Sequence, residues 1–147
     1  MTLETWSLNM HRVVFIGSNP SIKSAKLTPF WRDTNSSKVL KSWLEHLQDE
    51  EDVSFYNVSD TPTENNRPLK VSEIKANLQL LKYKLDTYSL YKVPIKVVAL
   101  GKTAEKALTL LHIPHFAMPH PSGLNRKLND KAYVGEKLKA LIEFIQK

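Results

Sequence analysis

Four short apolar runs alternate with amphipathic helical patterns along this chain, and this alternation constrains its fold more than any other feature. The runs are rich in β-branched and aromatic residues, each is followed directly by Gly, Asn or Pro, and they cover residues 13–16, 53–56, 95–100 and 115–118. Short runs of this kind are typical of buried strands in a parallel sheet. Apolar residues at spacings of three and four predict helices over 38–47, 72–88, 103–111 and 134–145. Ser72 is the expected N-cap of the second helix.

A regular alternation of strand and helix predicts a parallel sheet with right-handed crossovers. We therefore expect an α/β fold, a three-layer sandwich with a central four-stranded parallel sheet flanked by helices. The length of 147 residues suits one core, so residues 1–147 are expected to form a single domain. Such sheets place their sites beyond the carboxyl ends of the strands, here in residues 17–31, 57–68, 101–103 and 119–126.

The charge balance favours an anionic partner. Lys and Arg total 21 against 15 Asp and Glu, which gives a formal net charge of +6. A positive charge of this size suits nucleic acid, although many basic proteins bind none. The chain has no apolar run near the roughly 20 residues that a membrane-spanning helix requires, and its N-terminus lacks the apolar core of a secretion signal. We therefore expect no membrane association and a cytoplasmic location.

Cysteine is absent from the sequence. This absence excludes disulfides, thiol nucleophiles and cysteine-ligated clusters, and it leaves any metal to His and carboxylate ligands. His112, His115 and His120 are the candidates, but Pro114 and Pro119 interrupt the segment and no helical i, i+4 pair of histidines exists. We therefore expect no metal site.

Two loops carry the residue types that chemistry needs. Residues 17–21, Gly-Ser-Asn-Pro-Ser, follow the first run, where the glycine permits a sharp turn and the proline fixes the next step. Asn19 is then held at the mouth of a strand, where its amide could orient a water, although such sequences also form purely structural turns. Residues 120–126, His-Pro-Ser-Gly-Leu-Asn-Arg, follow the last run. They combine an imidazole, a rigid turn, an apolar side chain and an arginine; the structural alternative is a histidine and a leucine packed on the core.

Together these segments resemble the uracil-DNA glycosylase superfamily. Residues 17–21 are similar to the Gly-x-Asn-Pro-Gly water-positioning motif of the mismatch-specific uracil and thymine-DNA glycosylases. Residues 120–126 are similar to their Asn-Pro-Ser-Gly-Leu-Ser-Arg loop, but with the histidine of the classical and thermophilic uracil-DNA glycosylases. Phe-Tyr-Asn-Val at 55–58 resembles the strand end whose asparagine reads the uracil edge, and Asn-Arg-Pro at 66–68 resembles the Asn-Arg-x-Pro of the thermophilic group. Thr-Pro-Phe at 28–30 resembles the segment whose aromatic ring stacks on the flipped base.

The resemblance implies a DNA glycosylase that flips uracil, or a related modified or mismatched pyrimidine, out of duplex or single-stranded DNA and leaves an abasic site. It implies catalytic roles for Asn19 and His120. The residues expected to bind the base are Ser18, Ser21, Phe30, Trp31 and Asn57. The residues expected to contact DNA are Gly101, Lys102, Thr103, Ser122, Gly123, Leu124, Asn125 and Arg126. Leu124 would fill the vacated stack. No Schiff-base lysine is implied, so we expect a monofunctional enzyme. The resemblance also implies a monomer without a cofactor. We expect it in a bacterial, archaeal or phage-infected cell, associated with the nucleoid.

Two departures from the family pattern matter. The thermophilic group holds an iron–sulfur cluster through cysteines, and this chain has none, so that cofactor is ruled out. The first motif has no carboxylate at Ser18 or Asn19, which implies weaker water activation. The alternative function is therefore a catalytically weak or inactive relative that binds DNA or a replication or repair protein. Small Ser21 also leaves room for thymine or another 5-substituted pyrimidine.

Other residues near the expected site have simpler interpretations. Gly101-Lys102-Thr103 resembles the end of a P-loop, but the required upstream glycine would fall at Lys96. The segment still offers a helix N-terminus that suits a DNA phosphate. The carboxylates of Asp33, Asp60 and Glu64 are expected to be solvated loop charges, and Asp60 is the one to test as a substitute base.

Overall fold

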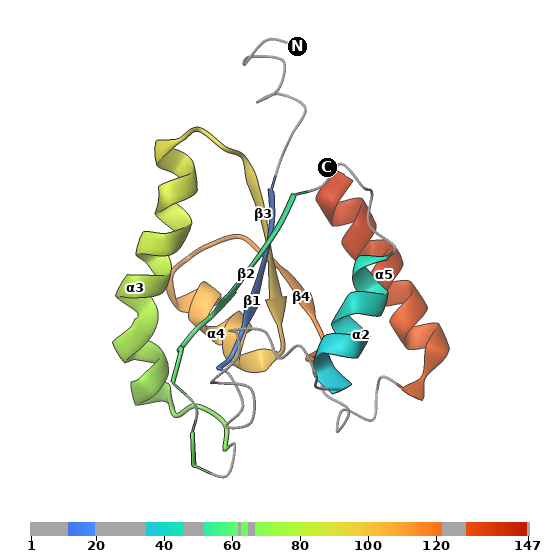
Figure 1. Cartoon of the computed structure of the whole chain (residues 1–147), viewed down its shortest axis with the longest axis horizontal. Coiled ribbons are helices and arrows are strands. Elements are labelled where there is room, and N and C mark those ends of the chain that lie inside the picture. Colours follow the sequence, from blue (N-terminus) through green and yellow to red (C-terminus); the bar gives the residue numbers. More distant parts are fainter. Residues whose placement is uncertain are drawn as a thin grey trace.

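The computed structural model describes residues 12–19, 35–45, 52–61, 63–64, 67–121 and 129–146. Figure 1 shows an α/β fold with one sheet between helices. The strands are β1 (Arg12–Gly17), β2 (Asp52–Asn57), β3 (Ile95–Leu100) and β4 (Phe116–Met118). The helices are α2 (Asn35–Leu44), α3 (Val71–Leu90), α4 (Lys102–Leu110) and α5 (Lys131–Gln146).

The sheet is four-stranded, and its strand order is β2-β1-β3-β4. All three strand pairs are parallel, with Gly17 opposite Asn57, Ile16 opposite Ala99 and Leu100 opposite Met118. The predicted four-stranded parallel sheet is therefore confirmed. Because the strands are parallel and in this register, their carboxyl ends meet at one edge of the sheet (Figure 1).

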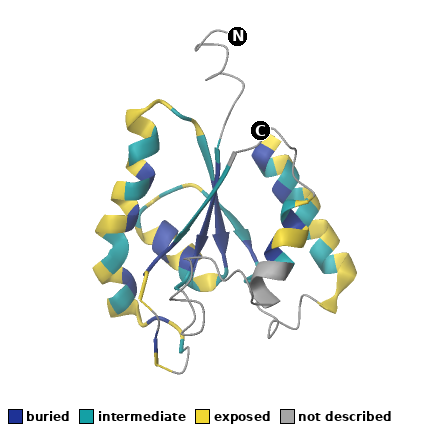
Figure 2. Cartoon of the chain, in the orientation of Figure 1, coloured by how far each residue is buried: buried dark blue, intermediate teal, exposed yellow. Residues whose placement is uncertain are grey.

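Helices cover both faces of the sheet, so the predicted three-layer sandwich is also confirmed. Alternate residues of each strand point to opposite faces. On one face Val14, Ile16 and Ala99 pack with α3 and α4, and on the other Phe15 and Leu100 pack with α2 and α5. Figure 2 shows the buried residues concentrated along the strands and on the inner faces of the helices. No helix within the described residues has the length and apolarity needed to cross a membrane.

Several predicted element bounds are wrong by a few residues. Ser72 is not the N-cap of α3, because the cap is Lys70, whose backbone N–H donates to the Glu73 carboxylate at 2.8 Å. Helix α5 begins at Lys131 rather than Val134, because the carboxylate of Asp130 accepts backbone N–H bonds in its first turn. Helix α2 begins at residue 35, three residues before the prediction, and residues 46–47 of its predicted end lie outside the described residues.

Candidate active site

The loops after β1 and β2 remain paired beyond the ends of the two strands. The backbone N–H of Val58 donates to the carbonyl of Gly17 at 2.9 Å, and that of Ser59 donates to the carbonyl of Ser18 at 3.0 Å. This continued pairing fixes the two loops against each other. It brings Asn19, two residues beyond Gly17, to the same edge of the sheet as Asn57, the last residue of β2.

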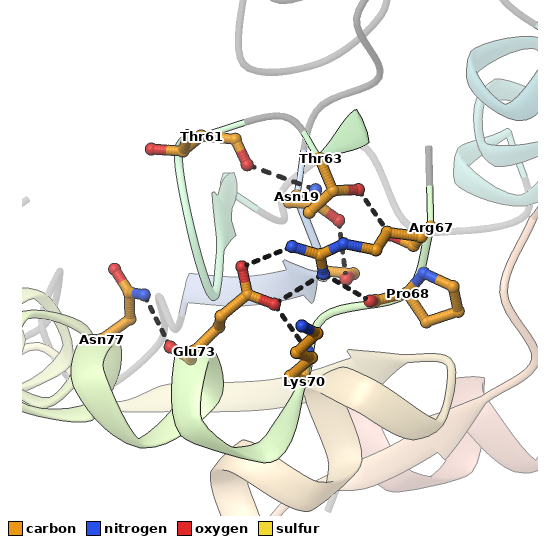
Figure 3. A network of polar contacts seen from close by, with 9 residues as sticks. Asn19, Thr61, Thr63, Arg67, Pro68, Lys70, Glu73 and Asn77 are labelled. Carbon is orange, nitrogen blue, oxygen red and sulfur yellow. Dashed lines mark hydrogen bonds and ion pairs between the residues drawn. The ribbon is translucent and has the colours of Figure 1, made fainter. Parts of the chain in front are cut away.

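The side chain of Asn19 is held by two hydrogen bonds. The Ser18 hydroxyl donates to Asn19 Oδ1 at 2.9 Å, and Asn19 Nδ2 donates to the backbone carbonyl of Thr61 at 3.2 Å (Figure 3). These contacts fix which end of the amide is the acceptor. A carbonyl oxygen has two lone pairs, so Oδ1 can accept a further hydrogen bond while it is bonded to Ser18.

Asn57 differs from Asn19 in its burial. Its side chain is only 2% exposed, and its amide oxygen is inaccessible to solvent. A buried amide in a fixed position offers a donor and an acceptor side by side, which suits recognition of a planar base edge. Ser59 and Thr63 are buried polar residues of the loop that follows.

The described part of the segment between β2 and α3 is tied to the start of α3 by an ion pair. The two terminal nitrogens of the Arg67 guanidinium donate to the two carboxylate oxygens of Glu73 at 2.7 and 3.1 Å (Figure 3). The Thr63 hydroxyl donates to the Arg67 carbonyl within the loop. The Arg67 fork and the Lys70 backbone N–H lower the pKa of Glu73 to about 2. The carboxylate is therefore ionised at neutral pH, and the loop that carries Thr61 is anchored.

His120 lies just beyond the end of β4, where it is packed against Gly101. The backbone N–H of Gly101 donates to the Met118 carbonyl at 2.9 Å, which joins the ends of β3 and β4. Gly101 has a φ of +91°, and a Cβ at this position would lie 3.0 Å from the Cβ of His120. Glycine is therefore required here by both backbone and space. Burial lowers the pKa of His120, so the imidazole is neutral at neutral pH.

A pocket of about 450 Å³ opens beside His120. Its lining comes from the end of β4, the start of α4 and the first half of α5, and includes Lys102, Met118, Tyr133 and Lys137. No motif in the sequence singles out Tyr133 or Lys137. Their spacing of four residues in a helix directly after the 120–126 loop is the only signal that could have indicated them.

The predicted site residues divide into three groups. The structure brings Ser18, Asn19, Asn57, Gly101, Lys102, Thr103 and His120 to the carboxyl edge of the sheet. Asp60 and Glu64 are exposed, and the Asp60 carboxylate forms an ion pair with Lys84 at 3.4 Å. The others lie outside the described residues: Ser21, Phe30, Trp31, Asp33, Ser122, Gly123, Leu124, Asn125 and Arg126. Within the described part of the chain, no three His, Asp or Glu side chains form a group that could hold a metal ion.

Sequence reasoning missed the contacts that hold Asn19 and its loop. The sequence indicates Arg67 only through the 66–68 motif and offers no separate reason to select Glu73. An acidic residue in the first turn of a predicted helix, six residues after an arginine, is a weak signal that becomes informative only once Asn19 is placed.

Comparison with known proteins identifies the family of this chain. The family model described as the uracil DNA glycosylase superfamily matches residues 7–144. No curated protein matches the chain at a significant level. The match extends over almost the whole sequence, and the four-stranded parallel sheet carries asparagine and histidine at the ends of β1, β2 and β4. This chain belongs to the uracil DNA glycosylase superfamily.

Proposed function

We propose that this protein is a monofunctional DNA glycosylase that flips uracil, or a related modified or mismatched pyrimidine, out of DNA and hydrolyses its N-glycosidic bond. The observation that carries the proposal is the position of Asn19, Asn57 and His120, each at or just beyond the carboxyl end of a strand, along one edge of the sheet. Membership of a superfamily whose members generally hydrolyse N-glycosyl bonds supports the same reaction class. The net charge of +6 suits a DNA substrate.

Asn57 is the residue proposed to read the base. Its amide can donate to O4 of uracil and accept from N3–H, a pattern that cytosine does not match. The side chain is buried at a strand end, which restricts its orientation, and its covered amide oxygen becomes available to a base only when the surrounding residues move aside. Phe30, with Trp31 as the alternative, is proposed to stack on the base, and Ser18 and Ser21 to line the pocket near its 5-position.

His120 is proposed to stabilise the leaving group. When the bond between the sugar C1′ and the base nitrogen breaks, the electron pair leaves with the base, and negative charge develops chiefly at O2. A hydrogen bond from His120 to O2 lowers the energy of that anion in the manner of an oxyanion hole. The lowered pKa of His120 supports a neutral imidazole in this role.

Asn19 is proposed to position the water that attacks C1′. Its Oδ1 can accept one hydrogen from a water while Nδ2 is held by Thr61. The water oxygen forms the new bond to C1′, and its proton passes to solvent or to the departing base. Asn19 is not a base, so this site is expected to react more slowly than one with a carboxylate.

A second candidate function is a catalytically weak relative that binds DNA or a replication or repair protein. It is favoured by one observation, the absence of a carboxylate at Ser18 and Asn19. Asp60, the proposed substitute base, is exposed and paired with Lys84, which weakens the case for it.

An excision assay tests the proposal. End-labelled oligonucleotides would carry uracil in a single strand, opposite G or opposite A, and abasic product would be revealed by alkaline cleavage. We expect scission that Asn19→Ala and His120→Ala abolish. His115→Ala is the matched control, because His115 precedes β4 at the opposite edge of the sheet and its ring bonds the Ile113 carbonyl. No scission at enzyme excess, on uracil or on 5-substituted pyrimidines, would favour the non-catalytic alternative.

A further inference from the structure

We propose that the pocket beside His120 binds the DNA backbone next to the flipped nucleotide, with the ammonium of Lys137 on a phosphodiester. This inference rests on the proposed function, because the orientation of the DNA is taken from the base site. The pocket has a volume of about 450 Å³, and its wall includes Lys102, Glu105, Met118, His120, Tyr133 and Lys137. His120 is therefore shared between the base site and this second site.

Lys137 is held in position by uncharged groups. Its Nζ donates to the backbone carbonyl of Ala117 at 3.2 Å and lies 5.3 Å from the centre of the Phe116 ring. Neither group neutralises the charge, and an ammonium has three N–H donors, of which the carbonyl uses one. Within the described residues, Lys137 forms no ion pair. A fixed ammonium with donors to spare loses little entropy when it binds an anion.

The remaining lining favours a phosphodiester with its nucleoside over a small anion alone. Among the described residues, the pocket lining contains two lysines and one carboxylate, Glu105, so this part of the lining carries a modest positive charge, which suits a group of single negative charge. Its volume exceeds what a phosphate group needs. Met118 and the ring of Tyr133 supply apolar surface on which a sugar or a base can rest.

The pocket is also in the right place for this role. Helices α4 and α5 lie on opposite faces of the sheet, and β4 ends between them (Figure 1). A strand of DNA whose flipped nucleotide reaches His120 must continue past that residue on one side or the other. Lys102 is the first residue of α4 and Lys137 lies in the first half of α5, so both lysines lie on the side of His120 where these helices begin.

The test measures DNA binding separately from excision. Wild-type protein and Lys137→Met would be titrated, by fluorescence anisotropy, into a uracil-free single-stranded oligonucleotide over a range of salt concentrations. Methionine keeps an apolar stem on the Phe116 ring and removes the charge. Loss of one phosphate contact is expected to weaken binding roughly fivefold to tenfold at low salt and to reduce the slope of log K against log salt by about 0.7. Lys139→Met, an exposed lysine on the same helix, is the matched control and should leave both values nearly unchanged.

For a second variant we expect the opposite change, tighter DNA binding. Glu105→Gln removes the one carboxylate that the described residues contribute to the pocket lining, and it should tighten binding by a fewfold. Glu143→Gln, at an exposed residue of α5, should not. Equal effects of Lys137→Met and Lys139→Met would mean diffuse charge attraction and would overturn the site. An unchanged slope in Lys137→Met, with an unchanged unfolding midpoint, would overturn it as well.

The outcomes separate this inference from the proposed function. If the protein excises uracil but Lys137→Met binds DNA as well as wild type, the glycosylase proposal stands and the proposed backbone site is refuted. If Lys137→Met weakens DNA binding but the wild-type protein excises no base, the backbone site is supported and the catalytic proposal is refuted. Competition by inorganic phosphate as effective as competition by the oligonucleotide would show a site for free phosphate instead of DNA, and would refute the proposal.

Discussion

Replacing Gly101 with alanine should destabilise the protein and displace His120. Gly101 has φ +91° and ψ 174°, a backbone region that is essentially restricted to glycine. The added Cβ would also lie 3.0 Å from the Cβ of His120 and 3.4 Å from its Cδ2. The added methyl group therefore destabilises the folded protein in two independent ways, through backbone strain and through a close contact with His120.

The size of the effect follows from these two costs. Holding a residue with a side chain in this backbone region costs about 1–3 kcal/mol. Forcing an extra carbon into a filled space costs about 1–3 kcal/mol more. The sum, about 2–6 kcal/mol, is a large part of the roughly 5–15 kcal/mol by which most domains are stable. If the chain relieves the contact by moving His120, excision should fall by about tenfold or more, because small misplacements of reacting groups are costly.

Urea unfolding of Gly101→Ala and wild type gives the free-energy difference, and the excision assay gives the functional one. Gly135→Ala is the matched control, because Gly135 lies in α5 and a Cβ there meets nothing within 4 Å. That substitution should stabilise the protein by about 0.5–1 kcal/mol through lower backbone entropy in the unfolded chain. A Gly101→Ala protein as stable as wild type and equally active would refute the assigned role of this glycine.

Three further predictions concern the rest of the fold. Glu73→Gln should lower stability at neutral pH. The Glu73 carboxylate has a pKa of about 2, below its ordinary 4.5, so its contribution should be full above pH 4.5 and shrink as the pH falls toward 2. Equal differences from wild type in urea unfolding at neutral pH and at about pH 3 would contradict this linkage. Tyr88→Phe should lower the pKa of Tyr56 from about 12 toward 10 without reaching it, because burial, the largest cause of the shift, remains. Ultraviolet titration of the phenol measures this pKa. An unchanged value would show that the 2.9 Å hydrogen bond between the two hydroxyls does not raise it. Leu108→Ala should lower the free energy of unfolding by about 2–5 kcal/mol, because Leu108 is fully buried in α4. Leu110, on the same helix, is partly exposed. A loss no larger than that of Leu110→Ala would contradict the packing of Leu108.

The architecture could be predicted because its signals are local. Each strand is a short apolar run with a marked end, and each helix has its own apolar periodicity. Those signals give the class of fold and the edge at which the site lies. They do not give the strand order β2-β1-β3-β4, which depends on how the helices pack.

The supporting contacts of the site could not be predicted for a physical reason. Asn19 is bonded to a carbonyl 42 positions away in the chain, and backbone atoms carry no sequence signal. The predicted N-cap of α3 is wrong because the Glu73 carboxylate accepts the backbone N–H of Lys70, which starts the helix before Ser72 without a serine cap. Lys137 reaches the pocket only because α5 packs against β4, which no local pattern reveals.

The bond between Asn19 and the Thr61 carbonyl has a consequence for how this site can change over time. The Thr61 side chain is exposed and the contact uses the main chain alone, so almost any amino acid at position 61 preserves it. Substitutions there should be nearly neutral for activity. Inserting or deleting one residue between the end of β2 and Arg67 would shift that carbonyl and should be far more damaging. The loop can therefore drift in composition while its length stays under strong constraint.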